Sequence, residues 1–245
     1  MDLRDRTVGA VVGLTIVSLF IRLVGLGGRV AHWDEGRVGY WILEYGETGV
    51  LFYRPIVHGP LLKLVNAPLF ELFGATDFVA RLFPAVVGGL LPLVALAFRH
   101  RLRDVVVVAL AGLLTLDPAL LYYSRFARND ILVAAFCLVA FASLVRAVDL
   151  DDGRYLPIAA VALALGFGAK ENALAYIFAF VGATGLLVIH RLVAAALGDR
   201  SLRSVLLERL RWSYDGARRH SRSIGGSAVS FVAVIVSVYA PRGSI

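Results

Sequence analysis

"GPLLKLVNAPLFELFG", residues 59–74, is the stretch on which the arrangement of the whole chain depends. The segment is apolar but short, carries Lys63, Asn66 and Glu71, and contains Pro68. A transmembrane helix needs about 20 apolar residues, whereas a shorter apolar helix with polar residues is typical of the membrane interface. We therefore predict that residues 59–74 lie in the interface and do not cross the membrane.

Outside this stretch the composition is that of a polytopic membrane protein. The chain has 245 residues, of which 59% are hydrophobic, and its mean hydropathy is +0.77. Long apolar runs alternate with short charged connections. This pattern predicts an all-α membrane helical bundle of about seven transmembrane helices, forming a single membrane domain over residues 1–245. The predicted spans are 7–26, 78–98, 104–123, 130–148, 155–169, 172–192 and 224–240.

The distribution of basic residues predicts the orientation. The net charge of +7 would suggest nucleic acid in a soluble protein. Here the charge lies in the connections, so we expect a lipid bilayer as partner and no nucleic acid. With a cytoplasmic N-terminus, 15 of the 25 Lys and Arg residues fall on the inner side and nine on the outer side. Arg22 lies inside the first span, where its side chain is expected to snorkel outward.

This bias agrees with the positive-inside rule and predicts a multi-pass protein of the cell membrane. The first outer loop, residues 27–77, is expected to carry interfacial helices. Residues 193–223 are expected to form a basic cytoplasmic loop.

Four polar clusters from distant parts of the chain fall on the outer side in this topology. They are "HWDEGR" (32–37), "YRPIVHGP" (53–60), "SRFARND" (124–130) and "GAKEN" (168–172). Ionisable residues near the membrane are costly and mark functional sites. Their shared side predicts one site at the outer boundary of the bilayer.

The first cluster allows two interpretations. Asp34 and Glu35 begin a segment with helical apolar periodicity. Asp34 can therefore be a helix N-cap and Glu35 a first-turn residue that favours the helix dipole. Alternatively, a carboxylate is held at the membrane edge as a general base, and a divalent metal beside it is left open. The two interpretations are compatible, because a cap also fixes the position of a side chain.

The second cluster centres on His58, which lies between Pro55 and Pro60. A histidine there can bind a phosphate oxygen or a metal, although a lone loop histidine is more often simply exposed. Arg54 and Lys63 add positive charge nearby.

The third and fourth clusters supply further cations. Arg125 and Arg128 precede Asp130, and guanidinium forks suit the oxygens of a phosphate. The alternative is that both arginines pair with Asp130 and with lipid headgroups. Lys170 lies between two predicted spans, either beside a polar cavity or in a plain helix–helix turn.

Carboxylates opposite cations at a membrane interface suit a substrate with a lipid tail and a phosphate head. The cations would hold the phosphate, and a carboxylate would take a proton from an attacking hydroxyl.

The order of these motifs resembles the GT-C superfamily of polyprenyl-phosphate-sugar-dependent glycosyltransferases, which includes the protein mannosyltransferase and lipid A aminoarabinose transferase branches. The Asp-Glu pair is followed by "HGPL" (58–61), "FGATDFVARLFPAVVGGLLPLVAL" (73–96), "SRFARND" (124–130) and "AKEN" (169–172). This fuller pattern is most similar to the haloarchaeal Agl-type membrane proteins described as flippase-activity-associated. The resemblance extends from residue 1 to about residue 240.

The resemblance implies inverting, mannosyltransferase-like transfer of a hexosyl group from a dolichyl-phosphate sugar to a glycan or protein acceptor at the outer face. By position it implies Asp34 as catalytic base with Glu35 as its neighbour, His58 as a phosphate contact, and Asp130 as the acidic residue opening the fourth span. Further implied phosphate ligands are Lys170 and Arg125. Members of the superfamily run longer, so we expect this chain to be the N-terminal part of such a fold, without a C-terminal region.

Two other functions compete with an enzyme. The same cluster suits an accessory protein or flippase partner that binds a lipid-linked sugar without chemistry. The nearly pure apolar character of the central spans argues against a path across the bilayer. A structural scaffold, in which the clusters serve as caps and anchors, is the third possibility.

Overall fold

The computed structural model describes residues 3–51, 53, 58–198 and 201–243, and their regular structure is helical apart from one isolated bridge. The helices at one end of the bundle are η1 (Leu26–Gly28), α2 (Trp33–Thr48) and α3 (Leu61–Phe73). The others are α1 (Leu3–Leu23), α4 (Asp77–Leu90), η2 (Leu91–Phe98), α5 (Asp104–Leu116), α6 (Pro118–Ser124), α7 (Asp130–Asp149), α8 (Tyr155–Ala169), α9 (Ala173–Ala196), α10 (Leu202–Arg219) and α11 (Ser221–Tyr239).

A membrane helical bundle is confirmed. Among the described residues, five helical stretches are long and apolar enough to cross a bilayer, namely Asp5–Gly28, Asp77–Phe98, α7, α9 and α11. The pair of α5 and α6 makes a sixth when counted as one span bent by 48°. The remaining predicted span is α8, an apolar helix of 15 residues that is shorter than a usual crossing.

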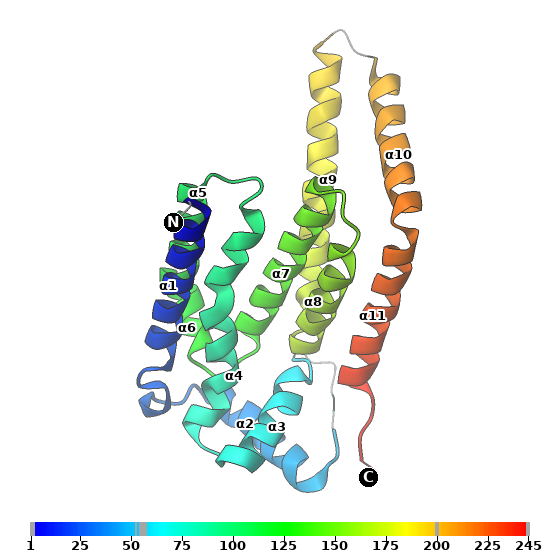
Figure 1. The fold of residues 1–245 in the computed structure, drawn as a ribbon. Helices are drawn as coiled ribbons and strands as arrows, with labels where there is room; N and C mark the ends of the chain where they lie inside the picture. The colour runs from blue at the N-terminus through cyan, green and yellow to red at the C-terminus, as the bar shows by residue number, and fades with distance from the viewer. Residues whose placement is uncertain (1–2, 52, 54–57, 199–200, 244–245) are drawn as a thin grey trace.

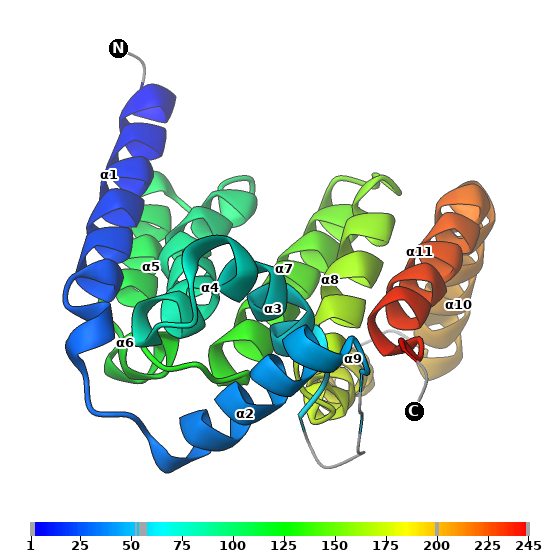
Figure 2. The same cartoon turned by 90° about the horizontal axis from the view of Figure 1, so that it is seen from below.

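Helices α2 and α3 lie across one end of the bundle (Figures 1 and 2). The segment 59–74 forms α3, a helix of 13 residues with Pro68 inside it, and it is not among the helices long enough to span. The apolar side of α3 packs onto the bundle, because Leu61 and Leu62 join a buried cluster with Ile131 and Leu132 of α7. The first loop is thus anchored to the start of α7.

The spans pack through small residues, as is usual in membranes. Helix α7 packs along α8, and α8 along α11. Helix α4 passes close to two neighbours at Gly88 and Gly89. A Cβ at Gly88 would lie 2.6 Å from Cβ of Ser124, and one at Gly89 would lie 2.5 Å from Cδ2 of Leu19. Larger residues would push α4 away from α1 and α6.

Arg22 does not snorkel outward, so that prediction is wrong. Its side chain is 0% exposed and donates to the carbonyls of Thr115, at 3.1 Å, and Leu114, at 3.2 Å. The carbonyl of Leu114 needs a donor because Pro118, four residues on, has no N–H. A cation in the bundle therefore stabilises the backbone where the span bends, at the junction of α5 and α6.

The predicted basic loop 193–223 consists largely of a helix. Helix α10 runs beside the end of α9 and leads into α11, and α9 and α10 rise beyond the other helices (Figure 1). This hairpin points away from the end that carries α2 and α3.

Candidate active site

Side chains from three of the four predicted polar clusters form one chain of ion pairs at the end of the bundle that carries α2 and α3. Arg128 Nη1 lies 3.3 Å from Asp34 Oδ2, and Arg128 Nε donates to Asp130 Oδ2 at 2.9 Å. Lys170 Nζ donates to the other oxygen of Asp130 at 2.6 Å. These four side chains are 12–26% exposed, so the cluster is shielded but open to a ligand.

His58, from the remaining cluster, joins this group through the backbone. It forms an isolated antiparallel bridge with Lys170, and the N–H of Gly59 donates to the carbonyl of Ala169 at 3.0 Å. A Cβ at Gly59 would lie 2.1 Å from the carbonyl oxygen of Gly168, so only glycine permits this approach. The loop carrying His58 is therefore pinned to the end of α8. Its neighbours Arg54 and Pro55 lie outside the described residues.

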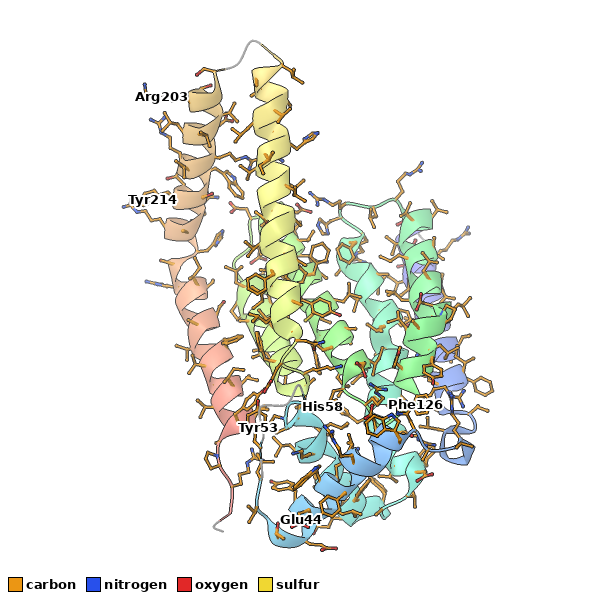
Figure 3. All side chains as sticks on the ribbon, turned by 180° about the vertical axis from the view of Figure 1, so that it is seen from behind. Glu44, Tyr53, His58, Phe126, Arg203 and Tyr214 are labelled. Atoms are coloured by element: carbon orange, nitrogen blue, oxygen red, sulfur yellow. The ribbon has the colours of Figure 1, made fainter. Side chains whose placement is uncertain are left out.

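The surroundings of His58 favour a neutral imidazole. Burial lowers its pKa below the usual 6.5, and the nearby charges of Lys170 and Arg37 lower it further. The carboxylates of Asp130 and Asp34 oppose this but do not outweigh it. The ring can thus donate one hydrogen bond to an anion near neutral pH, without being a cation. Figure 3 shows His58 at the same end of the molecule as Phe126.

The N-cap of α2 is His32 and not Asp34, so the capping interpretation of Asp34 is wrong. His32 Nδ1 accepts from the N–H of Asp34 at 3.2 Å, and Glu35 Oε2 accepts from the N–H of His32 at 2.8 Å. This reciprocal capping box makes Glu35 the third helical residue. Asp34 is left with its carboxylate directed to Arg128, and Oδ2 also lies 3.7 Å from His32 Nδ1.

Glu35 is enclosed by donors. Arg81 holds it with two bonds, Nε to Oε1 at 2.8 Å and Nη2 to Oε2 at 3.0 Å, and the N–H of Ala127 donates to Oε1 at 2.7 Å. Burial raises the pKa of this carboxyl, but the bonds from Arg81, Ala127 and His32 together hold it below the usual 4.5. Glu35 therefore stays ionised, tying α2 to α4 and to the turn before α7.

Arg125 is not brought to the ion-pair chain. Its guanidinium donates to the carbonyls of Ile21, at 2.6 Å, and Val24, at 2.7 Å, at the C-terminal end of α1. Bonds of this kind satisfy the last carbonyls of a helix. The structure thus gives Arg125 the position of a cap, where a phosphate ligand was expected.

Two residues of the site were not identified from the sequence. Arg81 is 1% exposed and also donates to the carbonyls of Leu26 and Arg29. Its position as the single charge in the apolar run 78–98 could have identified it, because a buried charge needs a partner. Asn129 contacts His58 and carries no such signal in the sequence.

In the parts of the chain that the structure describes, no three His, Cys, Asp or Glu side chains are gathered as a metal site would require. The site combines a carboxylate, Asp34, with the cations Arg128 and Lys170 and the neutral ring of His58. Both cations keep N–H groups beyond those given to Asp130, and such groups bind phosphate oxygens.

Comparisons with known proteins identify the family and the fold of the chain. Residues 57–203, more than half of the chain, match the family model of dolichyl-phosphate-mannose-protein mannosyltransferases. This segment contains His58, Arg128, Asp130 and Lys170, and it begins after Asp34. No curated protein matches the chain.

A solved structure shares the fold. It is the S. cerevisiae protein O-mannosyltransferase Pmt1–Pmt2 complex bound to the sugar donor, with a TM-score of 0.65 and 21% identity. The alignment covers 98% of this chain and 34% of that one, so our chain spans about a third of its length. The expected GT-C-like bundle is confirmed by this match, and by its matching family model the chain belongs to the dolichyl-phosphate-mannose-protein mannosyltransferase family.

Proposed function

We propose that this protein transfers a mannosyl or related hexosyl group from a dolichyl-phosphate-linked sugar to a hydroxyl of a protein or glycan acceptor. The observation that carries the proposal is the single ion-pair chain from Asp34 through Arg128 and Asp130 to Lys170, with His58 beside it. The matching family is described by dolichyl-phosphate mannose, and the similar solved complex holds a sugar donor.

The cations and His58 bind the phosphate of the donor in this proposal. Arg128 offers a planar fork, Lys170 a point charge, and His58 a neutral N–H. Asp130 contacts both cations and keeps them at one place. When a phosphate arrives, it takes the N–H groups that Asp130 leaves free.

Asp34 acts as the general base. The acceptor oxygen attacks C1 of the sugar and gives its proton to Asp34. The bond between C1 and the phosphate oxygen breaks, and its electron pair leaves with dolichyl phosphate. Attack opposite the leaving group inverts the configuration at C1. The cations stabilise the charge that develops on the phosphate as it leaves.

Glu35 and Arg125 position this site and do not touch the substrate. Glu35 fixes the first turn of α2, on which Asp34 lies. Arg125 fixes the turn that carries Arg128 against the end of α1.

The test is transfer from labelled dolichyl-phosphate mannose by the wild-type protein and by Asp34→Asn. Loss of a general base predicts turnover reduced by about 10² to 10⁴, with donor affinity changed much less. Glu47→Gln is the matched control, because Glu47 lies in α2 together with Asp34 and is exposed. Unchanged turnover in Asp34→Asn would remove Asp34 from the mechanism. Donor binding by a wild-type protein that transfers nothing would favour the accessory role, which a flipping assay in acceptor-free vesicles then tests.

We further propose that the site faces the outside of the cell membrane, which the excess of basic residues on the opposite side supports. Glu47→Cys in α2 should react with an impermeant maleimide added to intact cells, whereas Arg218→Cys in α10 should not. Both positions are exposed. If Arg218→Cys reacted and Glu47→Cys did not, the protein would have the opposite orientation in the membrane.

A further inference from the structure

Asn129 lies at the N-cap of α7 and does not use its side chain as a cap. Asparagine at this position normally accepts a hydrogen bond from an N–H in the first helical turn. The residue is 3% exposed, and its side chain makes no capping bond to the helix. Among the described residues its Oδ1, also buried, has no hydrogen-bond partner. The fold forgoes a cap worth about 1 kcal/mol, so another contact of Asn129 should explain it.

That contact is His58. Asn129 Nδ2 lies 3.4 Å from His58 Nδ1. The amide atom placed toward the ring is the nitrogen, which can only donate, and this placement assigns Nδ1 of the imidazole as the acceptor. A neutral imidazole has one acceptor and one donor nitrogen, and the proton is therefore on Nε2.

We propose that Asn129 is a positioning residue that holds His58 in the tautomer with its proton on Nε2. Its use rests on the function proposed above, because a phosphate oxygen can accept only from a protonated ring nitrogen. The backbone bridge to Lys170 fixes the position of His58, and Asn129 fixes which ring nitrogen carries the proton.

The charges around His58 do not fix the tautomer by themselves. Lys170 after α8 and Arg37 of α2 disfavour the imidazolium, whereas Asp130 of α7 and Asp34 of α2 favour it. These charges determine whether the ring is protonated. The hydrogen bond from Asn129 determines which nitrogen keeps the single proton of the neutral ring.

The experiment is ¹H–¹⁵N long-range correlation spectroscopy of the full chain in micelles with ¹⁵N-labelled histidine, at about pH 8, above the usual histidine range. The chain has five histidines, and His58→Gln identifies the signal of His58. In the wild type we expect a protonated Nε2 and an unprotonated Nδ1. In Asn129→Asp the carboxylate accepts, so the proton should move to Nδ1. A wild-type His58 protonated on Nδ1, or an unchanged tautomer in Asn129→Asp, would overturn the proposal.

Asn172→Asp is the matched control. Asn172 is the N-cap of α9, is exposed, and likewise makes no side-chain capping bond to its own helix. It should leave the tautomer of His58 as it is. Donor binding provides a second measurement: Asn129→Asp should weaken it by about 10-fold or less, the range of one hydrogen bond. The tautomer is read without substrate, so a failure of the proposed transfer reaction leaves this result standing, and the reverse also holds.

Discussion

Replacing Glu35 by Gln should loosen α2 and the turn before α7 without unfolding the remaining bundle. The side chains of Glu35 and Arg81 are 7% and 2% exposed, so the pair is buried and little screened. Glutamine keeps one acceptor oxygen but places an NH₂ group where Oε1 or Oε2 now accepts. Arg81 loses its buried counter-ion, while its bonds to the carbonyls of Leu26 and Arg29 and its 3.9 Å ion pair with the exposed Asp77 remain.

Breaking one partner of a buried pair costs about 3–5 kcal/mol. We take about 3 kcal/mol for Glu35→Gln, because the remaining oxygen still accepts. This energy corresponds to an opening equilibrium increased by about 100-fold. Hydrogen–deuterium exchange of the purified protein in micelles should therefore show protection lost at the start of α2 and at residues 125–129, and retained in α7 and α8.

The double variant Glu35→Leu with Arg81→Met distinguishes the cost of an unpaired buried charge from the cost of lost packing. Removing both charges is often neutral, so the double variant should exchange more slowly than Glu35→Leu alone. The exposed Glu47 of α2 gives the control variant Glu47→Gln, which should change nothing. Unaltered exchange in Glu35→Gln, or a double variant looser than Glu35→Leu, would refute the assignment of Glu35 as the anchor of α2.

Two further predictions concern the loop that carries His58. His58→Ala should weaken donor affinity more than it slows transfer, which the concentration dependence of transfer measures; an unaltered apparent affinity would remove His58 from the phosphate site. Gly59→Ala should push the loop from α8, because its Cβ would meet the carbonyl of Gly168, and transfer should fall with it. Gly39→Ala in α2, where a Cβ meets nothing within 4 Å, is its control and should stay active.

The spans could be predicted because lipid forces each segment to satisfy its backbone within itself. Convergence of the polar clusters followed from topology, since loops on one side of a membrane share one end of the bundle. The individual roles could not be predicted in the same way. Arg125 and Arg128 are similar in sequence, yet one caps α1 and the other faces Asp34 and Asp130. The path of the chain between Ser124 and Asp130 determines which of the two arginines caps α1 and which one joins the ion pairs.

Arg22 shows the same limit inside the membrane. The sequence marks a charge within a span, and snorkelling is the usual solution. The bend at the junction of α5 and α6 offers carbonyls that need donors, and this satisfies Arg22 within the bundle. Predicting the contact would require knowing that α1 packs beside that bend.

The adjacent Asp34 and Glu35 are explained by the geometry of α2. Successive helical residues point about 100° apart, so one neighbour can be buried while the other faces a site. Two successive residues of the turn before α7 bind these two carboxylates. The N–H of Ala127 binds Glu35, and the next residue, Arg128, binds Asp34. Two adjacent residues on each side thus fix both the rotation and the height of α2 over α7. If Asp34 were the only carboxylate, the rotation of α2 about its axis would not be fixed. The direction in which the Asp34 carboxylate points therefore depends on the buried Glu35.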